Sequence, residues 1–185
     1  MTDTLSTARA STLWIVLLTA ASTGGTLIFA CATPFAPLAA LAALHMRRRD
    51  GIVLMLLAWA ASQAVGFGLL AYPHDARTVA WGAGLAAAAV GSLFGARAGL
   101  ARLGTAAFPV RLLGAYVAAF VAFKLVILMW SVPLGGVAAA LSPDIMLRQF
   151  VRNGAILLGL LALYHALVRI GVPALAAAPR AARAA

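Results

Sequence analysis

The chain has 185 residues, 64% of them hydrophobic, and its 14 Lys and Arg against 4 Asp and Glu give a net charge of +10. Soluble domains are about half apolar, so this composition excludes a water-facing globule. The few acids lie outside the middle of every apolar segment, which excludes paired-carboxylate catalysis. We attribute the positive charge to loops that face an anionic membrane surface, and we expect no nucleic-acid partner.

Six apolar segments follow one another along the chain, at residues 12–30, 34–46, 51–71, 78–96, 112–132 and 148–170. A helix needs about 20 apolar residues to cross a bilayer. We therefore predict an all-α integral membrane protein, a bundle of six transmembrane helices. Residues 1–11 are then a cytoplasmic lead-in, residues 12–170 the membrane domain, and residues 171–185 a flexible basic tail.

The breaks between these segments alternate in charge. Alternate breaks hold ten of the fourteen basic residues, namely Arg9, Arg47, Arg48, Arg49, Arg97, Arg102, Arg111, Arg169, Arg180 and Arg183. Basic residues near the ends of membrane spans are retained in the cytoplasm. We therefore expect a multi-pass protein of a bacterial inner membrane, surrounded by membrane lipid, with both termini in the cytoplasm.

The first two segments are compatible with two topologies. Pro34 and Pro37 divide an apolar run that is too long for one span, because proline disfavours helix continuation. The segment 34–46 is short for a full crossing, so a re-entrant helix remains an alternative. Trp14 stands where an interfacial aromatic belongs, and the single cysteine, Cys31, leaves no internal disulfide.

Small residues recur four positions apart on two segments. Gly91, Gly95 and Gly99 form one such face, and the pairs Ala20/Gly24 and Ala21/Gly25 form another on the first segment. Small residues at this spacing let another helix backbone approach closely. Two interpretations remain open, namely packing within the bundle and docking of another membrane subunit.

Polar side chains gather in the predicted outer half of the bundle. Lys124 lies well inside its segment without an intramembrane carboxylate to neutralise it, and ionisable residues there are functional candidates. Side chains at similar or shallower depth are Gln63, Arg148, Gln149, Arg152 and Asn153. They predict a pocket for a polar or anionic ligand, on which Trp81 and Trp130 would stack, under a lid formed by Cys31, Thr33 and the turn 72–77. The alternative is that the arginines reach lipid phosphates.

Other chemistry has weak support in the sequence. Ser92 and His165 both fall in the inner half, but Ser92 lacks the pattern of a catalytic serine. The three histidines, His45, His74 and His165, lie at different depths or sides, which argues against a metal site. No phosphate-binding glycine loop occurs. We expect no enzyme activity, no cofactor and no bound metal.

Small size, six spans, cytoplasmic termini, a short second span and the small-residue face at Ala20, Ala21, Gly24 and Gly25 resemble the substrate-binding S component of energy-coupling-factor vitamin transporters. The resemblance covers residues 12–170 and is architectural, and Ala20-x-x-x-Gly24 departs from the Ala-x-x-x-Ala pattern usual in that family. It implies an outward-facing vitamin pocket and a partnership with a transmembrane coupling subunit and ATPases, or operation alone.

We therefore predict uptake of a small polar or anionic solute, such as a vitamin, as the function. The alternative is a membrane scaffold or assembly factor that recruits a partner through its glycine faces. The first function predicts sensitivity to replacement of Lys124 and Arg152, and the second predicts sensitivity at Gly91, Gly95 and Gly99.

Overall fold

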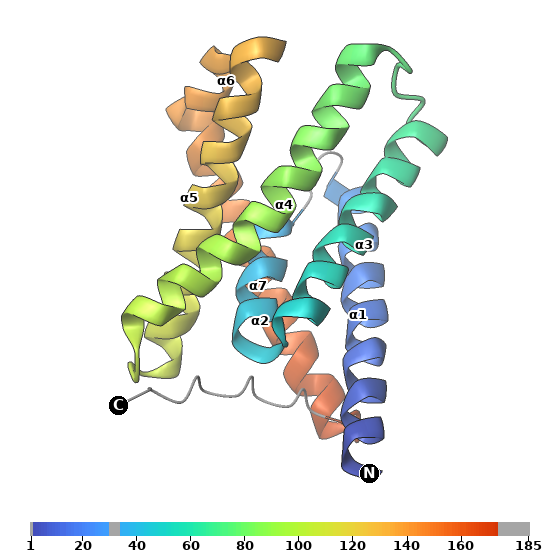
Figure 1. The fold of residues 1–185 in the computed structure, drawn as a ribbon, viewed down its shortest axis with the longest axis vertical. Helices are drawn as coiled ribbons and strands as arrows, with labels where there is room; N and C mark the ends of the chain where they lie inside the picture. Colours follow the sequence, from blue (N-terminus) through green and yellow to red (C-terminus); the bar gives the residue numbers. More distant parts are fainter. Residues whose placement is uncertain (1, 30–33, 174–185) are drawn as a thin grey trace.

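The computed structural model describes residues 2–29 and 34–173, and within the first helix it describes the surroundings of side chains 10–21, 23 and 24. All secondary-structure elements of this described part are helices (Figure 1). Its helices are α1 (Thr2–Phe29), α2 (Phe35–His45), α3 (Arg48–Gly68), α4 (Ala76–Leu103), α5 (Phe108–Leu134), α6 (Val137–Leu141) and α7 (Pro143–Arg169).

Four of these helices, α3, α4, α5 and α7, are long and apolar enough to cross a membrane. They have between 21 and 28 residues, which meets the length that a bilayer requires. The shorter apolar helical stretches are Ala10–Ala21 of α1 and the whole of α2. The prediction of an all-α fold is therefore confirmed, and within the described residues four of the six predicted crossings correspond to helices that are long and apolar enough to span a membrane.

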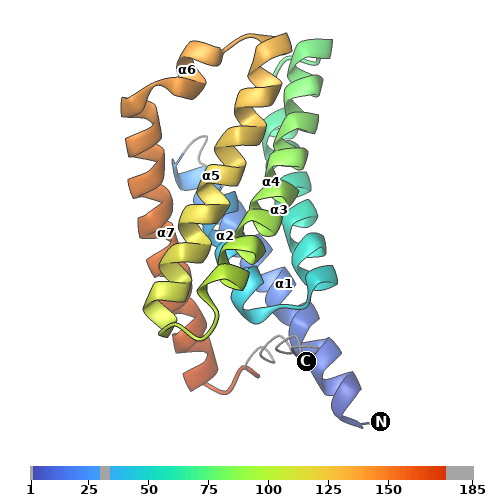
Figure 2. The ribbon, with the colours of Figure 1, turned by 60° about the vertical axis from the view of Figure 1, so that its left-hand side comes forward.

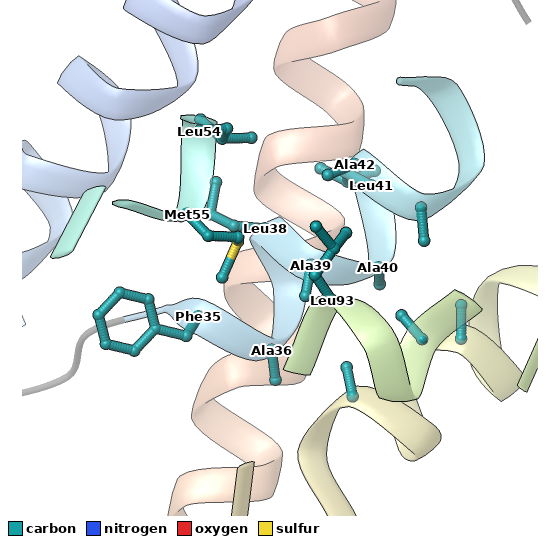
Figure 3. Close-up of a cluster of buried hydrophobic side chains, with 14 of the residues drawn as sticks. Phe35, Ala36, Leu38, Ala39, Ala40, Leu41, Ala42, Leu54, Met55 and Leu93 are labelled. Carbon is teal, nitrogen blue, oxygen red and sulfur yellow. The ribbon is translucent and has the colours of Figure 1, made fainter. Parts of the chain in front are cut away.

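Helix α2 is a core helix and is too short to cross a membrane by itself. Its 11 residues span about 17 Å, against a hydrocarbon thickness of about 30 Å. Every residue from Phe35 to Ala43 is buried, because α3, α4, α5 and α7 surround the helix. Figure 3 shows its side chains among Leu54 and Met55 of α3 and Leu93 of α4. A helix that is apolar on all sides is stable only when it is enclosed in this way.

The C-terminus of α2 is closed by a basic side chain from α4. The guanidinium of Arg97 donates a hydrogen bond to the backbone carbonyl of Met46, at 2.8 Å. The last carbonyls of a helix lack partners inside the helix and carry partial negative charge, so a cation stabilises them. Arg97 thus has a structural role in addition to its predicted role in setting the orientation.

Most basic residues in the connections between helices lie at one end of the bundle. The start of α1, the α2–α3 and α4–α5 connections and the last turn of α7 lie at the lower end in Figure 1, and the α3–α4 turn and α6 lie at the upper end. We name the lower end, which holds Arg47, Arg48, Arg49 and Arg102, the Arg-rich end. The upper end is called the opposite end.

Trp14 ties α1 to the last residues of the described chain. Its side chain is fully buried, its indole N–H donates to the carbonyl of Pro173 at 2.8 Å, and its ring lies 4.7 Å from that of Tyr164. Ser11 adds a hydrogen bond of 2.6 Å to Asp50 of α3. The Trp14 ring, expected at the membrane interface, is covered by protein at the end of α7.

Residues Val137–Leu141 form the short helix α6 (Figure 2). Gly135 and Gly136 precede it with φ angles of 82° and 101°, a conformation that glycine adopts without steric cost. Pro143 then occupies the first turn of α7, where its missing N–H is not needed. Helix α6 therefore links the far ends of α5 and α7 across the opposite end of the bundle.

Candidate functional site

A cavity of about 670 Å³ lies between α3, α4, α5 and α7, in their halves near the opposite end. Its walls are formed by Ser62, Gln63, Tyr72, Trp81, Leu85, Phe123, Lys124, Ile127, Ile145, Arg148, Gln149, Arg152 and Asn153. Its volume lies within the range of about 300 to 1,000 Å³ that is typical of small-molecule sites. Seven of the eight residues predicted to bind substrate line this one cavity, and Trp130 is the exception.

Helical spacing explains why these side chains meet. On α5, Phe123, Lys124 and Ile127 share one face, since residues three and four apart are neighbours on a helix. The face of α7 toward the cavity follows the same rule over two turns, with Ile145, Arg148, Gln149, Arg152 and Asn153. Ser62, Leu85, Phe123, Ile127 and Ile145 also line the cavity, although the sequence did not point to them. Leu85, Ile127 and Ile145 lie three or four positions from predicted site residues, which was the available signal.

The cavity is positively charged. Lys124 projects from α5 and is partly buried, whereas Arg148 and Arg152 lie one turn apart on α7 and are exposed. None of the described residues that line the cavity is acidic, so no carboxylate within it neutralises these three cations. Three cations around one concave, partly apolar space raise the local concentration of anions and favour an anionic ligand.

Gln63 is held in position by a chain of hydrogen bonds between α3 and α4. Its amide donates to the Ser62 hydroxyl at 3.1 Å, and that hydroxyl donates to the carbonyl of Trp59 at 2.7 Å. The indole of Trp59 donates in turn to the carbonyl of Gly82 at 2.8 Å. A β-carbon at Gly82 would lie 2.9 Å from the Gln63 side-chain oxygen, so a larger residue there would displace this amide. The amide is therefore fixed before any ligand binds.

Asn153 brings an unpaired acceptor to the same cavity. Its side-chain oxygen is buried and has no hydrogen-bond partner within the described chain. A buried polar atom without a partner costs about 1 to 3 kcal/mol. This cost indicates a place where a ligand or a water molecule completes the hydrogen bonding.

A contact near the middle of the bundle sets the separation of α5 and α7. Tyr116, two turns from Lys124 toward the Arg-rich end, donates a hydrogen bond to the backbone carbonyl of Phe150. The rings of Tyr116, Phe120 and Phe150 pack together, with centroids 5.0 Å and 5.2 Å from Phe150. Gly154 lies beside the phenol, and a β-carbon there would make an ordinary contact of 3.8 Å with its oxygen. The cavity lies next to this contact, since Arg152 and Asn153 of α7 line it.

Of the two tryptophans predicted to contact a ligand, one lines the cavity and the other does not. Trp81 and Tyr72 line the cavity, and the ring of Tyr72 rests on Gly66, where a β-carbon would approach within 2.6 Å of it. Trp130 lies outside the cavity, because its indole packs over Gly84 and donates to the carbonyl of Ala80 at 2.7 Å. Trp130 therefore joins α5 to α4, and stacking of this residue on a ligand is not supported. Cys31 and Thr33, predicted parts of a lid, lie outside the described residues.

The glycine face of α4 is filled by α5. A β-carbon at Gly95 would lie 2.8 Å from the backbone oxygen of Ala118, and one at Gly99 would lie 2.7 Å from the β-carbon of the same residue. Gly91 faces Val126 at 3.2 Å. Of the two interpretations of Gly91, Gly95 and Gly99, the structure favours packing within the bundle. The scaffold alternative loses its main support, because this face is not free for a partner.

The small-residue face of α1 has a different environment. Ala20 is exposed and Ala21 partly buried, and a β-carbon at Gly24 would meet no atom within 4 Å. The surroundings of Gly25 lie outside the described residues. Helix α1 packs mainly against α3, so in its described part the face that carries Ala20 and Gly24 is open.

Ser92 and His165 are not brought together. Ser92 is fully buried and donates to the carbonyl of Ala88 at 2.7 Å, whereas His165 is exposed on α7 and contacts Tyr164. No hydrogen bond joins the two in the part of the chain that the structure describes. Within the same part, no three His, Cys or acidic residues are arranged to hold a metal ion.

Comparisons with known proteins leave the cavity as the guide to function. No protein-family model, no curated protein and no solved structure matches this chain.

Proposed function

We propose that this protein binds a small anionic or polar solute, such as a vitamin, in the cavity between α3, α4, α5 and α7, and imports it. The observation that carries the proposal is the presence of Lys124, Arg148 and Arg152 around one cavity whose described lining contains no acid. The partner-free oxygen of Asn153 and the fixed amide of Gln63 supply further polar contacts. Trp81 offers an aromatic face for a flat ligand.

Import requires that the cavity faces outward, and the charge distribution supports this orientation. Cytoplasmic loops are enriched in Lys and Arg, and the Arg-rich end lies opposite the cavity. We therefore place the Arg-rich end in the cytoplasm of a bacterial inner membrane. Single cysteines in place of His74 and Arg49, in a Cys31→Ser background, test the orientation. A membrane-impermeant thiol reagent should label the first position in intact cells and spare the second, and the reverse pattern would overturn the orientation.

Binding is tested by following a co-purifying molecule and the affinity for it. Lys124→Met and Arg152→Met each remove a cation from the cavity, and Arg169→Met removes one from the Arg-rich end of the same helix as Arg152. Hydrogen bonds to charged groups contribute about 1.5 to 3 kcal/mol, which corresponds to roughly 10- to 100-fold in affinity. We expect mass spectrometry to find the solute with the wild type and with Arg169→Met, and to find it depleted from both cavity variants. Equal retention by all four proteins would contradict the proposed site.

A coupling partner is the second part of the proposal. The chain contains no phosphate-binding glycine loop, so energy for import has to come from another subunit or from the solute gradient. We assign the contact with a transmembrane coupling subunit and its ATPases to the small-residue face of α1, at Ala20, Ala21, Gly24 and Gly25. Gly24→Leu should then lower uptake by cells while the purified variant binds the solute as tightly as the wild type. Unchanged uptake would show that this face is not used.

A further inference from the structure

A second, apolar cavity adjoins the first between α5, α6 and α7. It has a volume of about 190 Å³. Its walls are seven apolar side chains, among them Val121, Leu128, Leu141 and Met146, together with Lys124. Lys124 also lines the large polar cavity, so this one side chain stands at the boundary between the two spaces.

The position of this apolar slot follows from how α5 and α7 are joined. The Tyr116–Phe150 contact holds the two helices together near the middle of the bundle, and α6 connects them at the opposite end. Between these two links the slot is bounded by α5 and α6, with Met146 of α7 as a further wall. Figure 2 shows how these three helices follow one another. Val121 and Leu141 at its walls are 50% and 54% exposed. The slot is therefore open to the surroundings of the bundle, and its apolar walls suit an apolar chain.

We propose that the two cavities together take one amphipathic anion. Its anionic headgroup lies among Lys124, Arg148 and Arg152, and its apolar chain occupies the slot between α5, α6 and α7. This inference rests on the proposed anion-binding function and defines the class of solute. Lysine suits the boundary, because its aliphatic stem lies against apolar surface while its ammonium reaches a polar region.

A ligand that occupied only one of the two cavities would leave the other without a role. A fully polar solute needs no apolar chamber beside its binding cations, and such a chamber would hold water unfavourably, since it offers few polar partners. An uncharged lipid chain gains nothing from three unneutralised cations. An amphipathic anion uses both sets of contacts at once.

The proposal can be tested by measuring the binding of alkyl phosphates to the full chain in nanodiscs of zwitterionic lipid. Binding of inorganic phosphate, butyl phosphate and octyl phosphate is measured against free aqueous concentration, with empty nanodiscs subtracted and octanol as the uncharged control. We expect affinity to rise about twofold to fourfold for each added methylene that the slot buries. Octanol should show no binding above empty nanodiscs, since it lacks the headgroup.

A matched pair of variants on α6 locates the apolar chain. Ala140 lines the slot and is partly buried, whereas its neighbour Ala139 is exposed. Ala140→Phe fills the slot and should abolish the preference for octyl over butyl phosphate, and Ala139→Phe should retain it. Equal affinity of the wild type for inorganic, butyl and octyl phosphate, with loss of all three in Lys124→Met, would overturn this inference and leave the proposed anion site standing. Absence of binding by every phosphate would contradict both.

Discussion

The two halves of the bundle are built from different residues and have different properties. Toward the Arg-rich end, α2 is enclosed by four helices, and Ala115, Ala119, Leu157 and Leu160 of α5 and α7 are buried around it. Toward the opposite end, α7 has no buried residue before Leu157, and a cavity of about 670 Å³ takes the place of a core. Small and apolar residues close one half, and long polar residues keep the other half open.

Because of this difference, we expect one set of residues to determine the stability of the fold and another set to determine ligand binding. Helices in a membrane associate through close packing, which small residues allow. The tightly packed half therefore holds the helices together, while the open half presents cations that contribute little to folding. We expect substitutions in the Arg-rich half to lower the free energy of unfolding, and substitutions around the cavity to change ligand affinity with little loss of stability.

The largest expected effect is at the seam between α4 and α5. Gly95→Leu forces a side chain against the backbone oxygen of Ala118, which would lie 2.8 Å from the new β-carbon. Overpacking of this kind costs about 3 kcal/mol, because a helix backbone cannot move aside cheaply. Thermal unfolding in detergent measures the loss. The control is Gly159→Leu on α7, where no atom lies within 4 Å of the new β-carbon and the change should stay within about 0.5 kcal/mol.

A similar melting temperature for Gly95→Leu and Gly159→Leu would show that α4 and α5 are not packed as described. In that case the glycine face would again be free, and the scaffold alternative would regain its support.

The next prediction is a gain in stability rather than a loss. Lys124→Met removes an unneutralised cation from a membrane-spanning helix, where a charge costs roughly 3 kcal/mol at the centre. The cavity hydrates the ammonium in part, so we expect a gain in stability of about 1 kcal/mol, together with loss of anion binding. The melting temperature should rise for Lys124→Met and stay near that of the wild type for Lys124→Arg, which keeps the charge. A fall with Lys124→Met would show that the cation is part of the packing.

The polar residues around the cavity could be predicted from the sequence more readily than the packing of the Arg-rich half. Charged and amide residues within apolar segments are few, so Gln63, Lys124, Arg148, Gln149, Arg152 and Asn153 could be assigned to one site, and all of them line one cavity. Alanine and glycine are frequent, so the faces at Gly91 and at Ala20 could not be distinguished. One is filled by α5 and the other is open.

Two further features depend on tertiary contacts that no local pattern contains. Trp14 and Trp130 have the positions of interfacial aromatics in the sequence, yet each donates to a backbone carbonyl of a distant residue, Pro173 and Ala80. The burial of α2 likewise depends on which helices surround it. Its length alone indicated only that it does not match a full crossing.

The boundary between the two halves is tested by Tyr116→Phe. This variant keeps the ring packing with Phe120 and Phe150 but removes the hydrogen bond to the Phe150 carbonyl. Loss of one such bond costs about 1 kcal/mol. Because the contact also sets the separation of α5 and α7, we expect anion affinity to fall by a few fold in the same variant. If stability falls while affinity stays unchanged, the cavity is shaped independently of this contact.

The smallest effect concerns the turn at the opposite end, where Asp75 caps α4. Its carboxylate accepts a hydrogen bond from the backbone N–H of Thr78 at 2.7 Å, and this bond holds the pKa of Asp75 below its ordinary value of 3.8. A carboxyl with a lower pKa in the folded state stabilises the fold above its unfolded pKa. That contribution is lost as the pH falls through the folded pKa.

We therefore expect Asp75→Ala to lower the melting temperature slightly at pH 7, with a difference from the wild type that shrinks below about pH 4. Asp75→Asn keeps a good capping oxygen but does not titrate, so its melting temperature should stay nearer that of the wild type at pH 7 and lack this acid-range change. The effect is small because the turn lies in the open half, where Asp75 and its neighbours are exposed to solvent. An Asp75→Ala loss as large as that of Gly95→Leu would mean that the opposite end, like the Arg-rich end, is held by its own packing, and the contrast between the halves would not stand.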